Sequence, residues 1–184
     1  MSKSRPVYAP FQLYPGGRAH LILTSAATAP EGLEEALGHI ESWVVRHLGP
    51  GVPAPIEGRI RPFRSPTEMM AQLAHRLKRE VVGLRLYVLG SEAFIWDAYN
   101  IAVGVGMHSS EISLHRVGPL RRRVYCTHCR TMIEDVTHSI VACPCCTASL
   151  FVRDHFSRRL AAFMGVKVDA EVPGEIPKAE LFTS

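Results

Sequence analysis

The sequence predicts an α/β domain built on a parallel sheet, followed by a small metal-binding module. Strand-like and helix-like segments alternate three times over residues 18–118 and end on a strand, which is the order typical of a parallel sheet with helices on its faces. All five cysteines gather within residues 126–146. Gly118-Pro119 marks the boundary, so we expect a four-cysteine module with a C-terminal helix and tail over residues 119–184.

The first strand and helix follow an N-terminal leader. Residues 1–17 contain three prolines and a Gly-Gly pair, and we expect them to be irregular. Residues 20–26 are an apolar run that predicts a short strand. A capping-box pattern at residues 28–31 then predicts a helix, because apolar residues recur at helical spacing from Leu33 to Val44.

The second strand–helix pair begins after a segment rich in glycine and proline. Residues 56–63 alternate apolar and polar side chains, as expected for a strand. Ser65 opens a second capping box with proline at the first helical position. The predicted helix carries Met69, Leu73 and Leu77 on one face.

The third pair has the strongest apolar strand. Residues 83–90 predict that strand, and Ser91 is placed to cap a helix with an apolar face from Phe94 to Val105. Glycines at 104 and 106 end this helix, and residues 111–117 predict the last strand. The domain is therefore expected to be complete at the boundary dipeptide.

Composition excludes some classes of protein. The chain is 47% hydrophobic and 21% charged, which is typical of a globular protein. It has no apolar run of membrane-spanning length and no apolar core of a signal peptide near its start. We therefore expect a cytoplasmic protein whose cysteines stay reduced, where clustered thiols bind metal more often than they form disulfides.

The cysteines form two Cys-x-x-Cys pairs, Cys126/Cys129 and Cys143/Cys146. Two such turns offer four thiolates, which close a tetrahedral shell around one Zn²⁺ ion and leave no open position for water or substrate. The pattern thus predicts a structural, zinc-ribbon-like site rather than a catalytic one. Cys145 lies between the second pair and is interpreted as a free thiol or one that lies beside the ligands without binding the metal.

Iron in the same shell is the alternative, since spacing does not separate the two metals. A rubredoxin-like centre of this kind would carry electrons. Such redox turns often have glycine after the second cysteine, whereas Arg130 and Thr147 stand there. The sequence therefore favours zinc and keeps iron as the second hypothesis.

A third hypothesis is a nucleic-acid-binding zinc ribbon. The net charge of +4 is modest, but arginines cluster at residues 121–123 and at 158–159, beside the cysteines. Clusters this short more often contact solvent or protein partners, so nucleic acid is the least favoured partner. Asp154-His155 is the nearest approach to an acid–base pair and is interpreted as structural, so we assign no catalytic residue.

The α/β domain resembles the nicotinamide-binding domain of ferredoxin reductases. That family has Gly-Gly-x-Gly-x-x-Pro in the first turn, where this chain has residues 24–30 without glycine. Family members carry Cys-Gly-Pro where Leu89-Gly90-Ser91 stands here. Phosphates need glycine for close backbone approach. We therefore interpret the domain as a degenerate relative with no dinucleotide site.

Residues 124–171 resemble the C-terminal domain of the dimethylamine monooxygenase small-subunit family, and residues 84–97 resemble its N-terminal half. The resemblance implies an accessory subunit of a heterotrimeric enzyme that oxidatively demethylates dimethylamine to methylamine and formaldehyde. It places haem in a catalytic subunit, and FMN, a 2Fe-2S cluster and NADPH in a reductase subunit. The zinc site would then hold Arg153, Arg158 and Arg159, with a helix at 160–166, as a docking surface for these partners.

Overall fold

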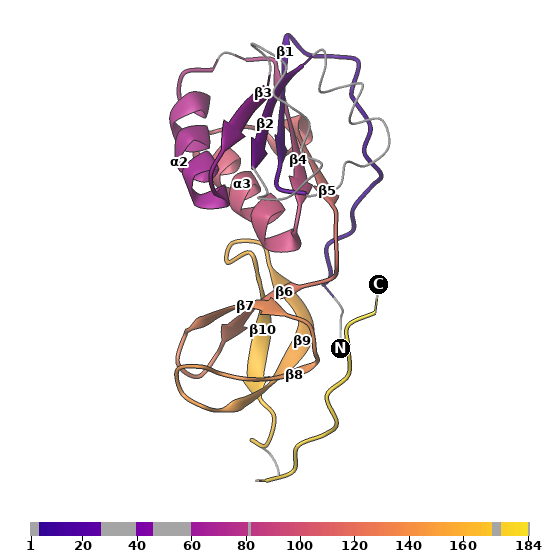
Figure 1. The fold of residues 1–184 in the computed structure, drawn as a ribbon, viewed down its shortest axis with the longest axis vertical. Coiled ribbons are helices and arrows are strands. Elements are labelled where there is room, and N and C mark those ends of the chain that lie inside the picture. Colours follow the sequence, from indigo (N-terminus) through magenta and orange to yellow (C-terminus); the bar gives the residue numbers. More distant parts are fainter. Residues whose placement is uncertain (1–3, 27–39, 46–59, 81, 171–173, 184) are drawn as a thin grey trace. The chain divides into compact units, whose positions relative to one another are not determined.

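The computed structural model describes residues 4–26, 40–45, 60–80, 82–170 and 174–183. The chain divides into two compact units (Figure 1). Residues 8–118 form the first, here called the α/β unit, and residues 119–184 together with residues 1–7 form the second, here called the cysteine unit. The start of the leader thus belongs with the C-terminal half of the chain.

The α/β unit is built on a five-stranded parallel sheet of order β3-β2-β1-β4-β5, which confirms the predicted fold class. The chain moves from β1 to β2 in one direction and from β3 to β4 in the other, so the switch point lies between β1 and β4. The elements are β1 (Ala19–Thr24), β2 (Glu41–Val45), β3 (Ile60–Phe63), α2 (Pro66–Leu77), β4 (Leu84–Gly90), α3 (Glu92–Gly104), the short 3₁₀ helix η1 (Ser109–Glu111) and β5 (Ile112–Arg116).

Strand β2 corrects the sequence-based assignment. The helical spacing that we extended to Val44 is wrong for residues 41–45, which pair with β1 and β3 as a strand. Trp43 is buried and contacts the ring of Phe63, and Ser42 is also buried. A strand buried on both faces reads as a continuous apolar run, which periodicity does not separate from a helix. The rest of that helix, at 28–39, lies outside the described residues.

Helices α2 and α3 begin where their caps predict. The Ser65 hydroxyl accepts a hydrogen bond from the backbone N–H of Glu68, and Met69, Leu73 and Leu77 are the buried stripe of α2. The Ser91 hydroxyl accepts the N–H of Phe94 at the start of α3. Both caps satisfy backbone donors that the first helical turn leaves without partners.

The second half of the leader packs on the sheet. Phe11 and Leu13 lie against a buried cluster of Ile22, Tyr87 and Leu89. The backbone N–H of Tyr14 donates to the Tyr87 hydroxyl at 3.0 Å. The leader therefore covers apolar side chains of the parallel sheet, although it has no regular secondary structure there.

Gly90 ends β4 at the switch point, and we expect Gly90→Ala to destabilise the α/β unit by about 2–3 kcal/mol. Its φ of +157° disfavours other residues, and an added Cβ would lie 2.1 Å from Ser25 Oγ and 2.9 Å from a ring carbon of Phe94. Urea unfolding measures the loss. Gly104→Ala is the matched control, because a Cβ there meets nothing within 4 Å. Equal stability of the two variants would contradict the expected crowding.

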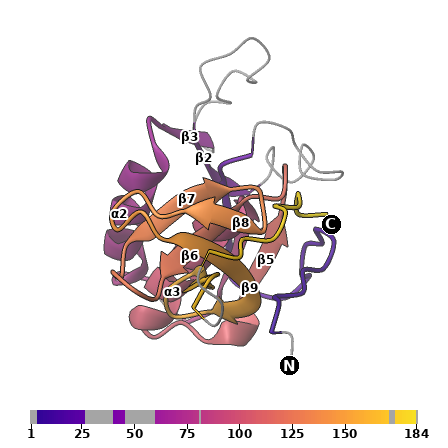
Figure 2. The ribbon, with the colours of Figure 1, turned by 90° about the horizontal axis from the view of Figure 1, so that it is seen from below.

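The cysteine unit holds a second five-stranded sheet of order β7-β6-β10-β9-β8, in which β6 and β10 are parallel and the other pairs antiparallel. Figure 2 shows this sheet from below. The strands are β6 (Arg122–Cys126), β7 (Met132–Val136), β8 (Ile140–Ala142), β9 (Ser149–Ser157) and β10 (Ala162–Lys167).

Strand β10 replaces the helix that we predicted at residues 160–166, and that prediction is wrong. The segment lies in the centre of the sheet between β6 and β9, so Phe163 and the small Ala162 and Gly165 are buried. A Cβ on Gly165 would lie 2.7 Å from a methyl carbon of Val124, which shows how closely the strands pack. Burial on both faces again produced an apolar run without strand periodicity.

No helix among the residues that the structure describes is long and apolar enough to cross a membrane. This agrees with the absence of a long apolar run in the sequence.

Candidate metal centre

Four cysteines meet at one end of the cysteine unit. Cys126 ends β6 and Cys129 lies in the turn that follows, while Cys143 and Cys146 lie in the turn between β8 and β9. Their four Sγ atoms all lie within 4.8 Å of one another. Cys126 and Cys143 are buried and, with Leu150, form a core cluster of this unit. The fold thus brings together all four predicted ligands.

The sulfur positions fit a tetrahedral metal. Four thiolates bound at about 2.3 Å lie about 3.8 Å from one another along the edges of the tetrahedron. Cys126 Sγ and Cys146 Sγ are 3.8 Å apart, and Cys129 Sγ and Cys143 Sγ are 3.5 Å apart. The donor set and its spacing therefore suit one metal ion with a closed shell.

The two turns have matching backbones. The N–H of Arg130 donates to the carbonyl of Cys126, and the N–H of Thr147 donates to the carbonyl of Cys143. Arg130 has a φ of +67° and Thr147 a φ of +58°, both in the left-handed region. The turns thus keep the conformation that glycine favours, without glycine. The missing glycines therefore do not discriminate between zinc and iron.

Thr147→Gly is expected to stabilise the cysteine unit by about 1 kcal/mol, because a β-branched residue is strained at positive φ. The measurement is the unfolding midpoint of the metal-loaded protein. Thr147→Ala is the control, since it removes the hydroxyl and the branch but still places a Cβ at φ +58°. A glycine variant no more stable than the alanine variant would argue against strain at this position.

The sulfur cluster shifts the acidity of its thiols in opposite directions. Hydrogen bonds with the hydroxyl and the backbone of Thr131 lower the pKa of Cys129 to about 5. The backbone N–H of Ala148 lowers the pKa of Cys146, but burial and the three neighbouring sulfurs outweigh it and raise that pKa to about 12. Four crowded sulfurs resist full ionisation by themselves, and a divalent cation relieves that repulsion.

Cys145 and His128 lie outside the cluster. Cys145 is exposed between two ligand positions, and His128 is exposed in the first turn. Neither belongs to the group of four close sulfurs. The cysteines with the two-residue spacing are therefore the ones that lie close together in the second turn.

The arginine cluster at 121–123 forms ion pairs within the unit. Arg121 pairs with Asp135 at 3.5 Å, Arg122 with Asp154 at 3.1 Å and Arg123 with Glu134 at 2.6 Å. A cluster whose charges are balanced by its own sheet attracts phosphate weakly. These pairs account for one of the two arginine clusters that supported the nucleic-acid hypothesis.

The predicted docking arginines lie on β9 and in the turn between β9 and β10. Arg153 is half-buried on β9, with its guanidinium 5.3 Å from the ring centre of Phe151. Arg158 and Arg159 are exposed in the turn itself. All three thus sit on a hairpin rather than beside a helix.

Sequence reasoning missed a buried cation in this unit. Arg122 is only 2% exposed, and its guanidinium lies 4.2 Å from the ring centre of Phe163 and 3.9 Å from that of Phe182. Asp154 accepts hydrogen bonds from both Arg122 and Arg5. Burial raises the pKa of Asp154, but these two hydrogen bonds outweigh it and hold the pKa below its usual range. Arg5 near one end of the chain contacts Asp154, and Phe182 near the other end contacts Arg122, so this buried pair holds both ends on the sheet.

At the switch point of the α/β unit, a carboxylate occupies the start of α3. Glu92 is buried there and accepts a hydrogen bond from the Tyr8 hydroxyl at 2.7 Å, which in turn accepts one from Trp96 Nε1. Burial and the Glu92 charge raise the pKa of Tyr8 above its usual range. A helix N-terminus at this place commonly holds a phosphate. In this chain its own carboxylate and leader residue Tyr8 lie there.

Comparisons with known proteins agree over both units. A family model described as "Dimethylamine monooxygenase subunit DmmA-like, C-terminal domain" matches residues 123–166, and the corresponding N-terminal domain model matches residues 51–112. The heme-dependent oxidative N-demethylase delta subunit of Ectopseudomonas mendocina (strain ymp) is 33% identical over 172 residues, covering 92% of this chain and 91% of that protein. No solved structure matches the chain.

Proposed function

Because the chain belongs to the family of DmmA-like dimethylamine monooxygenase subunits, we propose that it is a non-catalytic subunit of a haem-dependent oxidative N-demethylase. The similarity over nine-tenths of the delta subunit carries this proposal. The enzyme would convert dimethylamine to methylamine and formaldehyde. Haem would reside in a catalytic partner, and FMN, a 2Fe-2S cluster and NADPH would serve a reductase partner.

In this proposal the metal is zinc and its role is structural. Four thiolates with tetrahedral spacing fill the shell, so no position is left for a substrate. The first cysteine turn is hydrogen-bonded to β10, because both the N–H and the hydroxyl of Thr127 donate to the carbonyl of Gly165. Strand β10 leads directly back to the turn that carries Arg158 and Arg159.

The arginine surface of that hairpin would contact the partner subunits. Exposed arginine beside apolar side chains is typical of protein interfaces. The test is co-expression of the tagged chain with the haem and reductase subunits, followed by measurement of co-purification. Arg158→Glu combined with Arg159→Glu is expected to reduce recovery of a partner, whereas Lys178→Glu, another exposed position of the same unit, is the control. Full recovery with the double variant would contradict the docking role.

The α/β unit would bind no dinucleotide. The Glu92 carboxylate at the start of α3 repels a phosphate, and the Tyr8–Trp96 hydrogen bond closes the same place. Equilibrium dialysis with NADPH checks this directly, and binding at micromolar concentration would contradict it.

A rubredoxin-like iron centre is the second candidate. Two observations favour it. Cys129 and Cys146 are half-exposed, and the residue after each turn has the left-handed conformation that glycine adopts in redox turns. Elemental analysis of the purified chain separates the two candidates. One zinc per colourless chain supports the structural role, and one iron with visible absorption supports electron transfer.

A further inference from the structure

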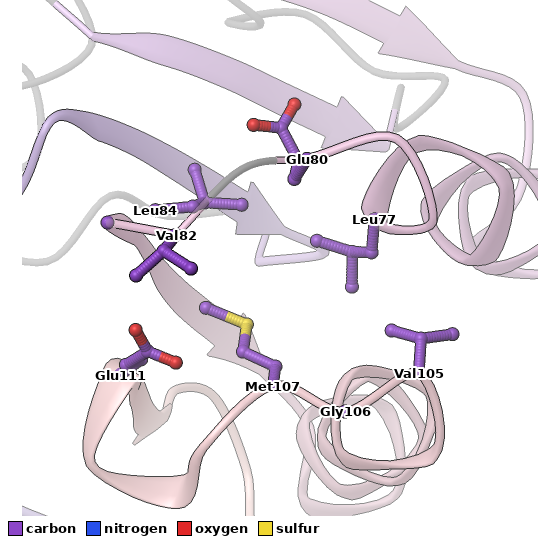
Figure 3. Close-up of a pocket in the computed structure, with 9 residues that line it drawn as sticks. Leu77, Glu80, Val82, Leu84, Val105, Gly106, Met107 and Glu111 are labelled. Carbon is purple, nitrogen blue, oxygen red and sulfur yellow. The ribbon is translucent and has the colours of Figure 1, made fainter.

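The α/β unit contains a pocket that neither the metal nor the switch point explains. It has a volume of about 200 Å³ and lies where α2 and α3 end and β4 begins. Figure 3 shows apolar side chains around its centre. The apolar residues that line it are Leu77, Val82, Leu84, Val105 and Met107.

The rim of this pocket is acidic. Glu80 and Glu111 are the charged residues among the described ones that line it. Glu80 already pairs with Arg76 at 3.0 Å, whereas the Glu111 carboxylate accepts a hydrogen bond from the backbone N–H of His108. Helix α3 also ends here, and its last turn holds no basic residue, so its negative end adds to the Glu111 charge.

Apolar side chains near the pocket reach into solvent. Val82, on the lining, is 89% exposed, and Val103, on the last turn of α3, is 42% exposed. Exposed apolar side chains beside polar ones are a feature of interaction sites. The pocket therefore offers apolar surface next to the negative charge of the Glu111 carboxylate.

We propose that this pocket receives an arginine or lysine side chain of another subunit, a docking contact that rests on the proposed multi-subunit function. The aliphatic stem of such a side chain would lie against Leu77, Val105 and Met107, and its cation would meet Glu111. Arginine in particular is enriched where interfaces concentrate their binding energy. The charge complementarity selects a basic side chain over an acidic or purely apolar one.

Two variants and a control test the contact. Val82→Lys puts a positive charge, the same sign as that of the incoming side chain, at the rim, and it is expected to weaken partner binding about 30-fold. Glu111→Gln retains the capping oxygen but removes the charge, and it is expected to weaken binding about fivefold at low salt, less at high salt. Val7→Lys is the matched control, because Val7 is 94% exposed in the other unit.

The measurement is the affinity of the purified full chain for its co-expressed partner subunits by surface plasmon resonance, with unfolding midpoints of all variants beside it. Weakening by Val82→Lys and Glu111→Gln but not by Val7→Lys supports the pocket contact. Binding of both pocket variants at the wild-type level overturns the pocket contact and leaves the proposed function intact. A wild-type chain that binds no subunit overturns the proposed function and the pocket contact together. A self-association that Val82→Lys abolishes would assign the pocket to a second copy instead.

Discussion

Replacing Cys143 with serine is expected to abolish metal binding and to unfold the cysteine unit. Cys143 is 1% exposed and packs with Cys126 and Leu150, so the ligands themselves are the core at this end of the sheet. A neutral hydroxyl is a poor fourth ligand for a metal that prefers thiolate. Structural zinc contributes about 10–16 kcal/mol of apparent binding free energy in small modules, comparable with the whole stability of a domain.

The measurement combines elemental analysis with hydrogen exchange. The variant should carry less than one-tenth of the wild-type metal content, and peptides from residues 119–184 should lose their protection. Peptides from residues 84–116 should keep theirs, because the parallel sheet of the α/β unit has its own core. A strong chelator added to the wild-type protein should reproduce the same pattern.

Cys145→Ser is the matched control for this prediction. Cys145 is exposed and adjacent to two ligand positions, but it lies outside the group of four close sulfurs. Its replacement should leave metal content and exchange unchanged. Metal loss in Cys145→Ser, or a full metal complement in Cys143→Ser, would show that the ligand set is wrong.

Local patterns were sufficient for much of the fold. The caps at Ser65 and Ser91 and the stripe from Met69 to Leu77 predicted α2 and α3, since a cap and a 3.6-residue period are local properties. The cysteine spacing predicted which four sulfurs lie close together, because each turn presents its two sulfurs without help from distant residues.

The same pattern-based reasoning assigned two strands wrongly, and for the same physical reason. Strand β2 and strand β10 both lie inside a sheet, so both of their faces are apolar and period two disappears. Apolar residues in such a run fall at helical spacing by chance. Only the partner strands, which are distant in sequence, decide the conformation.

The polar contacts of the chain ends were also beyond sequence reasoning. Tyr8 meets Glu92 across 84 positions, and Arg5 meets Asp154 across 149. Asp154 carried a weak signal, since an acid next to a histidine invites an acid–base interpretation. Its ion-pair partners in the structure are Arg5 and Arg122.

Arg122→Ala is expected to destabilise the cysteine unit by about 3 kcal/mol. Removing one partner of a buried ion pair typically costs about 3–5 kcal/mol, because the other charge stays buried without its partner. Asp154 is 25% exposed on its side chain and keeps Arg5, so the lower end of that range applies. The variant also removes the cation from between the rings of Phe163 and Phe182, which loses two cation–π contacts.

The position of Phe182 gives this prediction a second, local readout. The C-terminal tail is held by Phe182 on Arg122 and by backbone hydrogen bonds, from Ser139 to Glu180 and from Phe182 to Thr137. Arg122→Ala should therefore release residues 175–183 to fast hydrogen exchange before the sheet unfolds. Arg121→Ala is the matched control, since that neighbouring arginine is half-exposed and surface pairs contribute about 0–1 kcal/mol. A tail that stays protected in Arg122→Ala would mean that the backbone hydrogen bonds alone hold it, and that the buried cation stabilises only the sheet.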